Sequence, residues 1–191
     1  MPDRDLESIV SGAGVLPSEL LVLFDLYGTL VTASGALEFA PGAIALVKEL
    51  KRIGVTMGVV TSTENTRVVD DILISGGLKE CFSFVVSYED SPDHSERILA
   101  AISKAQKITG RSFERSNVFH FDDSLSRVEG SHRALINHVA VVPSPQYSLR
   151  EIQASSGSDF VIRGFADKAE VFGILFKKQS EATPRERHRV R

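Results

Sequence analysis

The chain has 191 residues, of which 42% are hydrophobic and 25% are charged, and these proportions are typical of a single globular domain with a sizeable core. A net charge of −3 gives no overall positive field, so no nucleic-acid partner is expected. The single cysteine, Cys81, excludes an intrachain disulfide framework and favours the cytoplasm or another reducing intracellular compartment. No membrane insertion is expected, because no apolar run approaches the roughly 18 residues that a span requires, and the acidic N-terminus does not suggest a leader peptide, because it lacks the apolar core of one.

Strand-like and helix-like segments alternate along the chain. Residues 1–19 predict a short helix or a loose lead-in, and residues 21–25 form an apolar run typical of a buried strand. Residues 31–41 predict a loop or a small hairpin. Beyond it, the apolar spacing and the turn residues predict helices over 43–53, 64–75, 93–108, 125–136, 147–154 and 166–176, and strands over 55–61, 82–87, 117–121, 138–142 and 159–162.

This alternation predicts an α/β fold, in which a mainly parallel sheet lies between two layers of helices in a three-layer, Rossmann-like arrangement. The main domain is expected over 20–178 and a basic, flexible tail over 179–191. No internal repeat divides the domain further.

Polar residues follow three of the predicted strands. Asp25 ends the first strand, Thr61 and Ser62 end the second, and Asp122 and Asp123 follow the fourth. Because the carboxyl ends of strands in a doubly wound sheet face one crevice, we expect these side chains to converge there. Carboxylates that converge repel one another unless one is protonated or a cation lies between them, and all-oxygen ligands suit Mg²⁺. The sequence therefore favours a metal site at this edge.

The run Asp25-Leu-Tyr-Gly-Thr-Leu resembles the first motif of the haloacid dehalogenase (HAD) superfamily, Asp-x-Asp-Gly-Thr-Leu/Val. The strand that ends at Thr61 is similar to the second motif, and Asp122-Asp123 is similar to the fourth. The order of the motifs is the same as in the family, and the resemblance spans about residues 20–145. It implies a HAD core and a Mg²⁺-dependent phosphatase that acts through an aspartyl-phosphate intermediate.

The resemblance also implies a role for each matching residue. Asp25 would be the nucleophile, and Thr61 would bind the transferring phosphoryl group, with Ser62, Gly28 and Thr29 beside it. The metal ligands would be Asp25, Asp123 and the backbone carbonyl of Tyr27, while Asp122 would orient Asp123. Asp122 and Ser124 are also typical helix N-caps, and both roles can hold at once.

Two residues depart from the family pattern. Tyr27 replaces the second Asp of the first motif, which serves as general acid and base, and a phenol is a poor base near neutral pH. Ser91, in Ser91-Pro92, replaces the Lys of the third motif, and Arg97 or Lys104 are weak candidates to supply the missing cation. These changes motivate an alternative, in which the chain is a catalytically degenerate HAD-fold subunit that binds a partner.

The spacing between the first and second motifs bears on the substrate. Only about a dozen residues separate Leu30 from Pro41-Gly42, too few for a helical cap, so the chain resembles the capless phosphatases. An open site suits a phosphorylated substrate of macromolecular size, or a protein partner that covers it. A haloacid dehalogenase-type hydrolase, in which Tyr also takes the second position, is disfavoured by the missing cap and by the paired carboxylates.

The five histidines, 94, 120, 132, 138 and 188, show no metal-ligand spacing. His120 alternates along its strand with Phe119 and Phe121, which predicts a packed histidine in the core.

Overall fold

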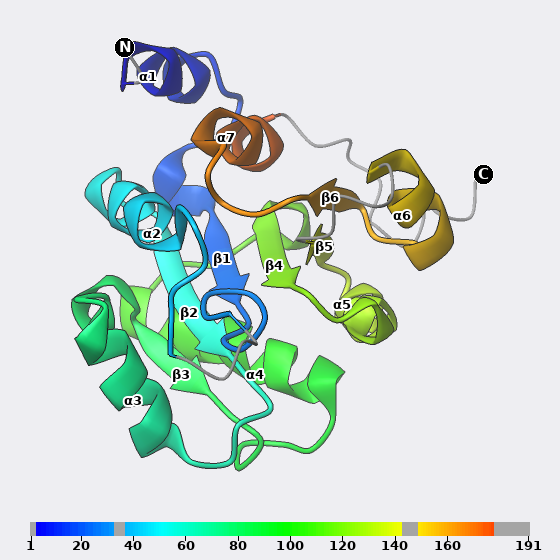
Figure 1. Cartoon of the computed structure of the whole chain (residues 1–191). Coiled ribbons are helices and arrows are strands. Elements are labelled where there is room, and N and C mark those ends of the chain that lie inside the picture. Colours follow the sequence, from blue (N-terminus) through cyan, green and yellow to red (C-terminus); the bar gives the residue numbers. More distant parts are fainter. Residues whose placement is uncertain (1–2, 33–36, 143–148, 178–191) are drawn as a thin grey trace.

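The computed structural model describes residues 3–32, 37–142 and 149–177, which form a six-stranded sheet with helices on both faces (Figure 1). The strand order is β3-β2-β1-β4-β5-β6, and all neighbouring strands are parallel. The strands are β1 (Leu21–Phe24), β2 (Thr56–Val60), β3 (Phe84–Val86), β4 (Val118–Asp122), β5 (Asn137–Val141) and β6 (Phe160–Ile162). The predicted α/β fold with a parallel, Rossmann-like sheet is thus confirmed.

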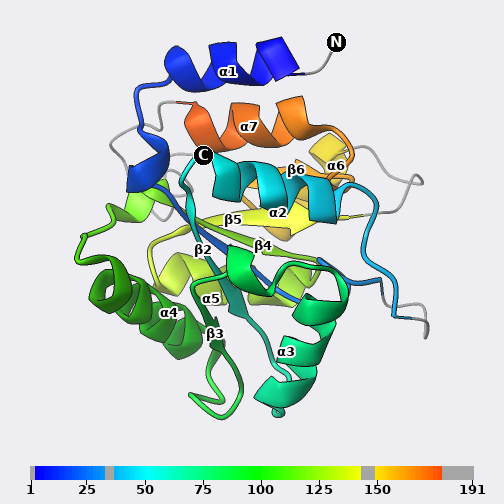
Figure 2. The same cartoon turned by 90° about the vertical axis from the view of Figure 1, so that its left-hand side faces the viewer.

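The helices cover the two faces of the sheet in two groups. They are α1 (Asp3–Ser11), α2 (Ala43–Arg52), α3 (Thr66–Ser75), α4 (His94–Thr109), α5 (Val128–Arg133), α6 (Leu149–Ser156) and α7 (Lys168–Phe176). One face carries α2, α3 and α7, with α1 outside α7 (Figure 2). The other face carries α4, α5 and α6. No helix in the described part of the chain has the length and apolar character needed to cross a membrane.

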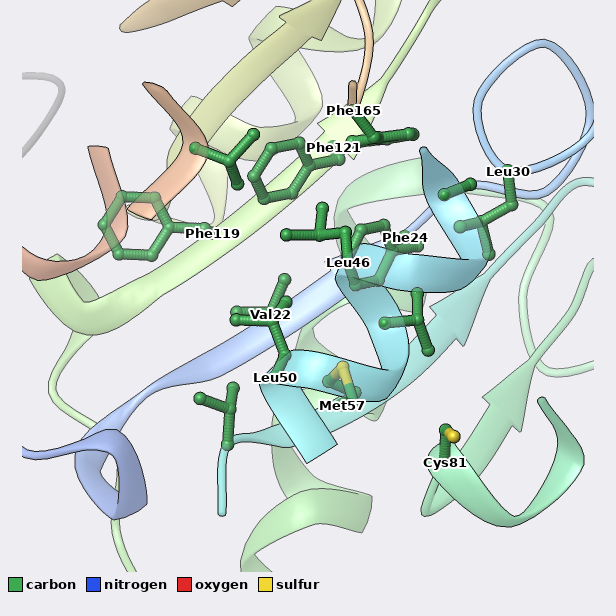
Figure 3. Close-up of a cluster of buried hydrophobic side chains, with 14 of the residues drawn as sticks. Val22, Phe24, Leu30, Leu46, Leu50, Met57, Cys81, Phe119, Phe121 and Phe165 are labelled. Carbon is green, nitrogen blue, oxygen red and sulfur yellow. The ribbon is translucent and has the colours of Figure 1, made fainter. Parts of the chain in front are cut away.

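Alternating side chains of the central strands separate two cores. Val22, Phe24 and Phe121 face α2, and the rings of Phe24 and Phe121 stack with centroids 5.2 Å apart (Figure 3). Leu21 and Leu23 face α4 instead. The strand β1 lies between β2 and β4 near the centre of the sheet, and every one of its residues is buried. Its carboxyl end carries Asp25.

Two predicted segments differ in detail. The helix expected over 125–136 is a 3₁₀ turn (Leu125–Arg127) followed by the short α5, because the positive φ of Leu135 (60°) turns the chain back towards β5. In the segment predicted as a loop or small hairpin, Thr32 N–H donates to Glu38 O at 2.8 Å, and residues 33–36 lie outside the described part. The predicted tail over 179–191 also lies outside it. The domain boundaries stay predictions.

Candidate active site at the carboxyl end of the sheet

Asp25 lies in the tight turn that follows β1. Its backbone N–H donates to Phe121 O of β4 at 2.9 Å, and its side chain is only 3% exposed. Gly28 then takes a φ of +86°, a conformation that L side chains rarely adopt. A Cβ at this glycine would lie 2.2 Å from Asp123 Oδ2. Gly28 is therefore required both for the turn and for the close approach of the Asp123 carboxylate.

Asp122 and Asp123 reach the same turn from β4. The backbone N–H of Asp123 donates to Thr29 Oγ1 at 3.1 Å, which joins the first and fourth motifs directly. Asp122 is fully buried and accepts from Ser124 N–H at 2.7 Å, whereas Asp123 is exposed. One carboxylate oxygen from each of Asp25, Asp122 and Asp123 lies within 4.8 Å of the others. The structure thus brings together the three carboxylates that the strand ends predicted.

Thr61 and Ser62 follow β2 on the other side of β1. The Thr61 hydroxyl donates to Thr63 Oγ1 at 3.1 Å and accepts from Thr63 N–H at 3.2 Å, so it stabilises the turn. Ser62 is exposed, and its hydroxyl accepts from Arg127 at 3.2 Å. Ser62 is therefore tied to the carboxylate cluster through Arg127.

Arg127 was not found from the sequence. Its Nη1 donates to Asp25 Oδ1 and to Asp122 Oδ2, each at 2.9 Å, and its side chain remains 23% exposed. The 3₁₀ turn after β4 brings this guanidinium back over the carboxylates. The available signal was a basic residue in the first turn after a strand that ends in two carboxylates.

The residues at the third motif form hydrogen bonds among themselves. The Ser91 hydroxyl donates to Glu96 Oε2 at 2.6 Å, and Arg97 Nη1 donates to Ser91 O and Pro92 O at 2.7 and 2.9 Å. Lys104 pairs with Asp90 at 2.8 Å. Within the described ranges, neither Arg97 nor Lys104 forms a hydrogen bond or ion pair with Asp25. The cation beside Asp25 comes from Arg127.

Burial dominates the electrostatics of the carboxylates. Burial and the neighbouring Asp122 carboxylate together raise the pKa of Asp25 to about 7, against the lowering effect of Arg127. Burial likewise raises the pKa of Asp122 to about 6 against the effect of Arg127. The guanidinium therefore compensates the two buried carboxylates only in part.

A cleft of about 500 Å³ opens beside Asp123. Its walls include Gly28, Thr29, Asp123, Phe165 and Glu170, so it joins the carboxylate cluster to a largely apolar surface. Tyr27, in contrast, is 43% exposed. No inserted domain interrupts the described chain between β1 and α2, so no large cap is present there.

A family model for haloacid dehalogenase-like hydrolases matches residues 22–141, more than half of the chain. The chain belongs to this family. The match contains the strand ends at Asp25, Thr61 and Asp122 in the order that the motifs predicted. No curated protein sequence gives a significant match.

Solved structures of HAD hydrolases share the fold at low sequence identity. A HAD-superfamily hydrolase from Ehrlichia chaffeensis is 16% identical with a TM-score of 0.63, over 85% of this chain and 99% of that one. A HAD phosphatase from Thermococcus onnurineus is 21% identical with a TM-score of 0.56, over 73% and 60% of the two chains. The candidate HAD hydrolase YfnB from Bacillus subtilis, solved with bound magnesium, is 18% identical with a TM-score of 0.56, over 72% and 55%.

Proposed function

We propose that the chain is a Mg²⁺-dependent phosphohydrolase in which Asp25 forms an aspartyl-phosphate intermediate. The observation that carries this proposal is the carboxylate of Asp25, which is buried at the end of the central strand yet lies within 4.8 Å of Asp122 and Asp123. Solved relatives that are described as a phosphatase and as magnesium-bound support it.

The residues present suit a hard cation. The donor set consists of carboxylate oxygens, which Mg²⁺ prefers, and burial, which raises the pKa values of Asp25 and Asp122, disfavours their charged forms, which a bound cation would stabilise. Gly28 leaves the space in which the Asp123 carboxylate rests. Asp25, Asp123 and the backbone carbonyl of Tyr27 would hold the ion, with Asp122 orienting Asp123. When bound, the ion would neutralise phosphate oxygens and so favour attack by an anion.

Residues of the chain itself carry the two steps. In the first, an Asp25 carboxylate oxygen attacks phosphorus, a P–O bond forms, and the bond to the leaving alkoxide breaks. In the second, water attacks the phosphoryl group and releases inorganic phosphate and the free carboxylate. Arg127 lies between Asp25 and Ser62, where it can pair with phosphate oxygens and take the place of the third-motif Lys. Thr61 would complete the phosphate site.

The leaving alkoxide needs a proton, and position 27 has no carboxyl group to donate it. The exposed phenol of Tyr27 would be a weak replacement, because a phenol is a poor acid–base catalyst near neutral pH. A general acid–base group contributes about 10²–10⁴ in rate, and the chain would lose most of this factor. Leaving groups that depart without protonation, such as phenolates, are therefore favoured. The open cleft beside Asp123 would admit a phosphorylated macromolecule or be covered by a protein partner.

The test is hydrolysis of an aryl phosphate by the full chain, with and without Mg²⁺, in wild type and in Asp25→Asn. Asp71→Asn, an exposed carboxylate on α3, is the matched control. We expect turnover that needs both the metal and Asp25, together with an acid-quenched protein one phosphoryl group heavier. Equal activity in wild type and Asp25→Asn would refute the mechanism.

The alternative is a degenerate HAD-fold subunit that binds a partner without turnover. The observation that favours it is the double pairing of Arg127 with Asp25 and Asp122, which already places one positive charge among the carboxylates. Wild-type protein that binds Mg²⁺ but neither hydrolyses aryl phosphate nor becomes phosphorylated would select this function.

A further inference from the structure

Three imidazoles, of which His120 and His138 are fully buried and His94 partly buried, gather behind the carboxylate cluster on the α4 face of the sheet. His94 begins α4, His120 lies in β4 and His138 in β5. The ring centroids of His94 and His120 are 5.0 Å apart, and those of His120 and His138 are 5.9 Å apart. The sequence indicated a packed histidine at 120, and it is buried, but the gathering of three rings from separate elements was not foreseen.

Most of the ring nitrogens in this cluster lack a hydrogen bond. Among the described residues, both nitrogens of His94, both of His138 and Nε2 of His120 are buried with no hydrogen-bond partner. Buried polar groups in native proteins are nearly always satisfied, and each orphan costs about 1–3 kcal/mol. Several such atoms in one place therefore indicate a ligand that the protein atoms alone do not provide.

The imidazoles are neutral and so have lone pairs to offer. Burial lowers the pKa of His94 to about 3, with Arg127 and Arg97 adding to the effect, and it lowers the pKa of His120 well below the ordinary value. Neutral imidazole is the form that binds metals.

The contacts of His120 orient one nitrogen towards Asp122. Its Nδ1 lies 3.3 Å from Ser131 Oγ, a hydrogen bond whose donor depends on the tautomer. With the proton on Nδ1, the Nε2 lone pair faces Asp122 Oδ2 at 3.7 Å, an unfavourable approach unless a cation lies between them. A metal-ligating histidine usually donates its other ring N–H to an oxygen acceptor, and the Ser131 hydroxyl can take that role for His120 Nδ1.

We propose that His94, His120 and Asp122 form a second metal site, specific for Zn²⁺ or a similar transition-metal dication. One ligand atom from each residue lies within 4.8 Å of the other two. Zinc bonds of about 2.0–2.2 Å place neighbouring tetrahedral ligands roughly 3.4 Å apart, so the 3.7 Å between His120 and Asp122 needs little adjustment. Gly130 makes room for His94, because a Cβ there would lie 2.7 Å from its ring.

The choice of metal follows from the ligands and charges. Two imidazoles and one carboxylate suit Zn²⁺, whereas Mg²⁺ prefers oxygen alone. Arg97 and Arg127 both act on His94 as positive charges and would weaken the binding of a dication, while Asp122 favours it. We therefore expect weaker binding than at a closed structural zinc site. Asp122 would link this site to the proposed Mg²⁺ site.

The experiment is titration of the metal-free full chain with Zn²⁺ by calorimetry, and with Co²⁺ by visible absorption. The double variant Asp25→Asn/Asp123→Asn removes two carboxylates of the neighbouring cluster but keeps Asp122. We expect one Zn²⁺ to bind in this double variant, and the same site to be filled in wild type beside any metal that the Asp25 and Asp123 carboxylates take. Affinity should fall by at least about 100-fold in His94→Gln, since loss of an outer-sphere partner alone costs about 10–100-fold. His138→Gln, which replaces the buried imidazole outside the ligand set, should keep the affinity.

Two outcomes would overturn the proposal. Zinc that is lost in the double variant but retained in His94→Gln belongs to the carboxylate cluster. The absence of stoichiometric binding in wild type means that water forms the hydrogen bonds of these ring nitrogens. X-ray absorption of the wild-type Zn²⁺ complex needs no variant, and it should count two imidazole ligands. Aryl phosphate hydrolysis with Mg²⁺ tests the proposed function separately, so the two proposals can fail independently.

Discussion

Replacing Arg127 with Met tests how the buried carboxylates are compensated. The substitution keeps a long side chain but removes the charge that lies 2.9 Å from both Asp25 and Asp122. Removing one partner of a buried ion pair costs about 3–5 kcal/mol. Because the Arg127 side chain is 23% exposed, we expect a loss of about 2–3 kcal/mol at pH 8, where both carboxylates are ionised.

The loss should shrink as the pH falls. Both folded-state pKa values, about 7 for Asp25 and about 6 for Asp122, lie above the ordinary value of 3.8, so the folded protein binds more protons than the unfolded chain between these limits. Stability from these groups is therefore lost as the pH rises through 6 and 7. Without Arg127 the folded pKa values rise further, and protonation below pH 5 removes most of the penalty.

Urea unfolding at pH 5 and pH 8 in a chelator measures this difference. Arg133→Met is the matched control, because Arg133 pairs with Asp93 at 2.8 Å on the exposed surface, where a pair contributes about 0–1 kcal/mol. Addition of Mg²⁺ at pH 8 should stabilise Arg127→Met more than wild type. A loss no larger than that of Arg133→Met, or one that does not change with pH, would refute the reasoning.

Three further changes test other parts of the structure. Gly28→Ala should cost about 1–3 kcal/mol of unfolding free energy and weaken Mg²⁺-dependent stabilisation, since the new Cβ would meet Asp123 Oδ2 at 2.2 Å. Thermal melts with and without Mg²⁺ measure both effects, and unchanged melts would contradict the assigned contact. Burial lowers the pKa of His138 from 6.5 to about 4, so its contribution to stability is present above pH 6.5 and is lost as the pH falls towards 4. Relative to His138→Gln, wild type should lose up to about 3 kcal/mol over that range, and parallel pH profiles would speak against a neutral, buried imidazole. Phe121→Ala removes a ring that stacks on Phe24 and should cost about 3–5 kcal/mol in urea unfolding, whereas a cost below 1 kcal/mol would show that the core refills.

The main features of the fold follow from patterns that are local in the sequence. Apolar runs that end in turn residues mark each strand, and their alternation with helices requires a parallel sheet with connections on both faces. The convergence of Asp25 and Asp122 follows in turn, because the carboxyl ends of β1 and β4 are neighbours in such a sheet. The boundaries around α5 were wrong because the left-handed backbone at Leu135, which ends the helix early, has no glycine to signal it.

Arg127 and the histidine cluster could not be predicted in the same way. The position of the Arg127 guanidinium depends on a 3₁₀ turn after β4, which the apolar spacing of an expected longer helix conceals. His94 and His120 belong to different elements, and only the placement of the first turn of α4 against β4 brings their rings together. Spacing along the chain carries no information on such contacts, since they depend on tertiary packing.

The position of Arg127 gives the substitution at Ser91 a physical meaning. The resemblance to the family implies a Lys before the helix that follows β3, where it supplies the cation beside the nucleophile. Here the Ser91 hydroxyl instead donates to Glu96, and the Ser91 carbonyl accepts from Arg97. The charge that Asp25 needs comes from the turn after β4 and contacts Asp122 as well. A cation held by two carboxylates is less available to a phosphate than one held by a single carboxylate. If the chain hydrolyses phosphate esters, substrate must therefore draw Arg127 from Asp122, and neutralisation of Asp122 by the second metal site would favour that exchange.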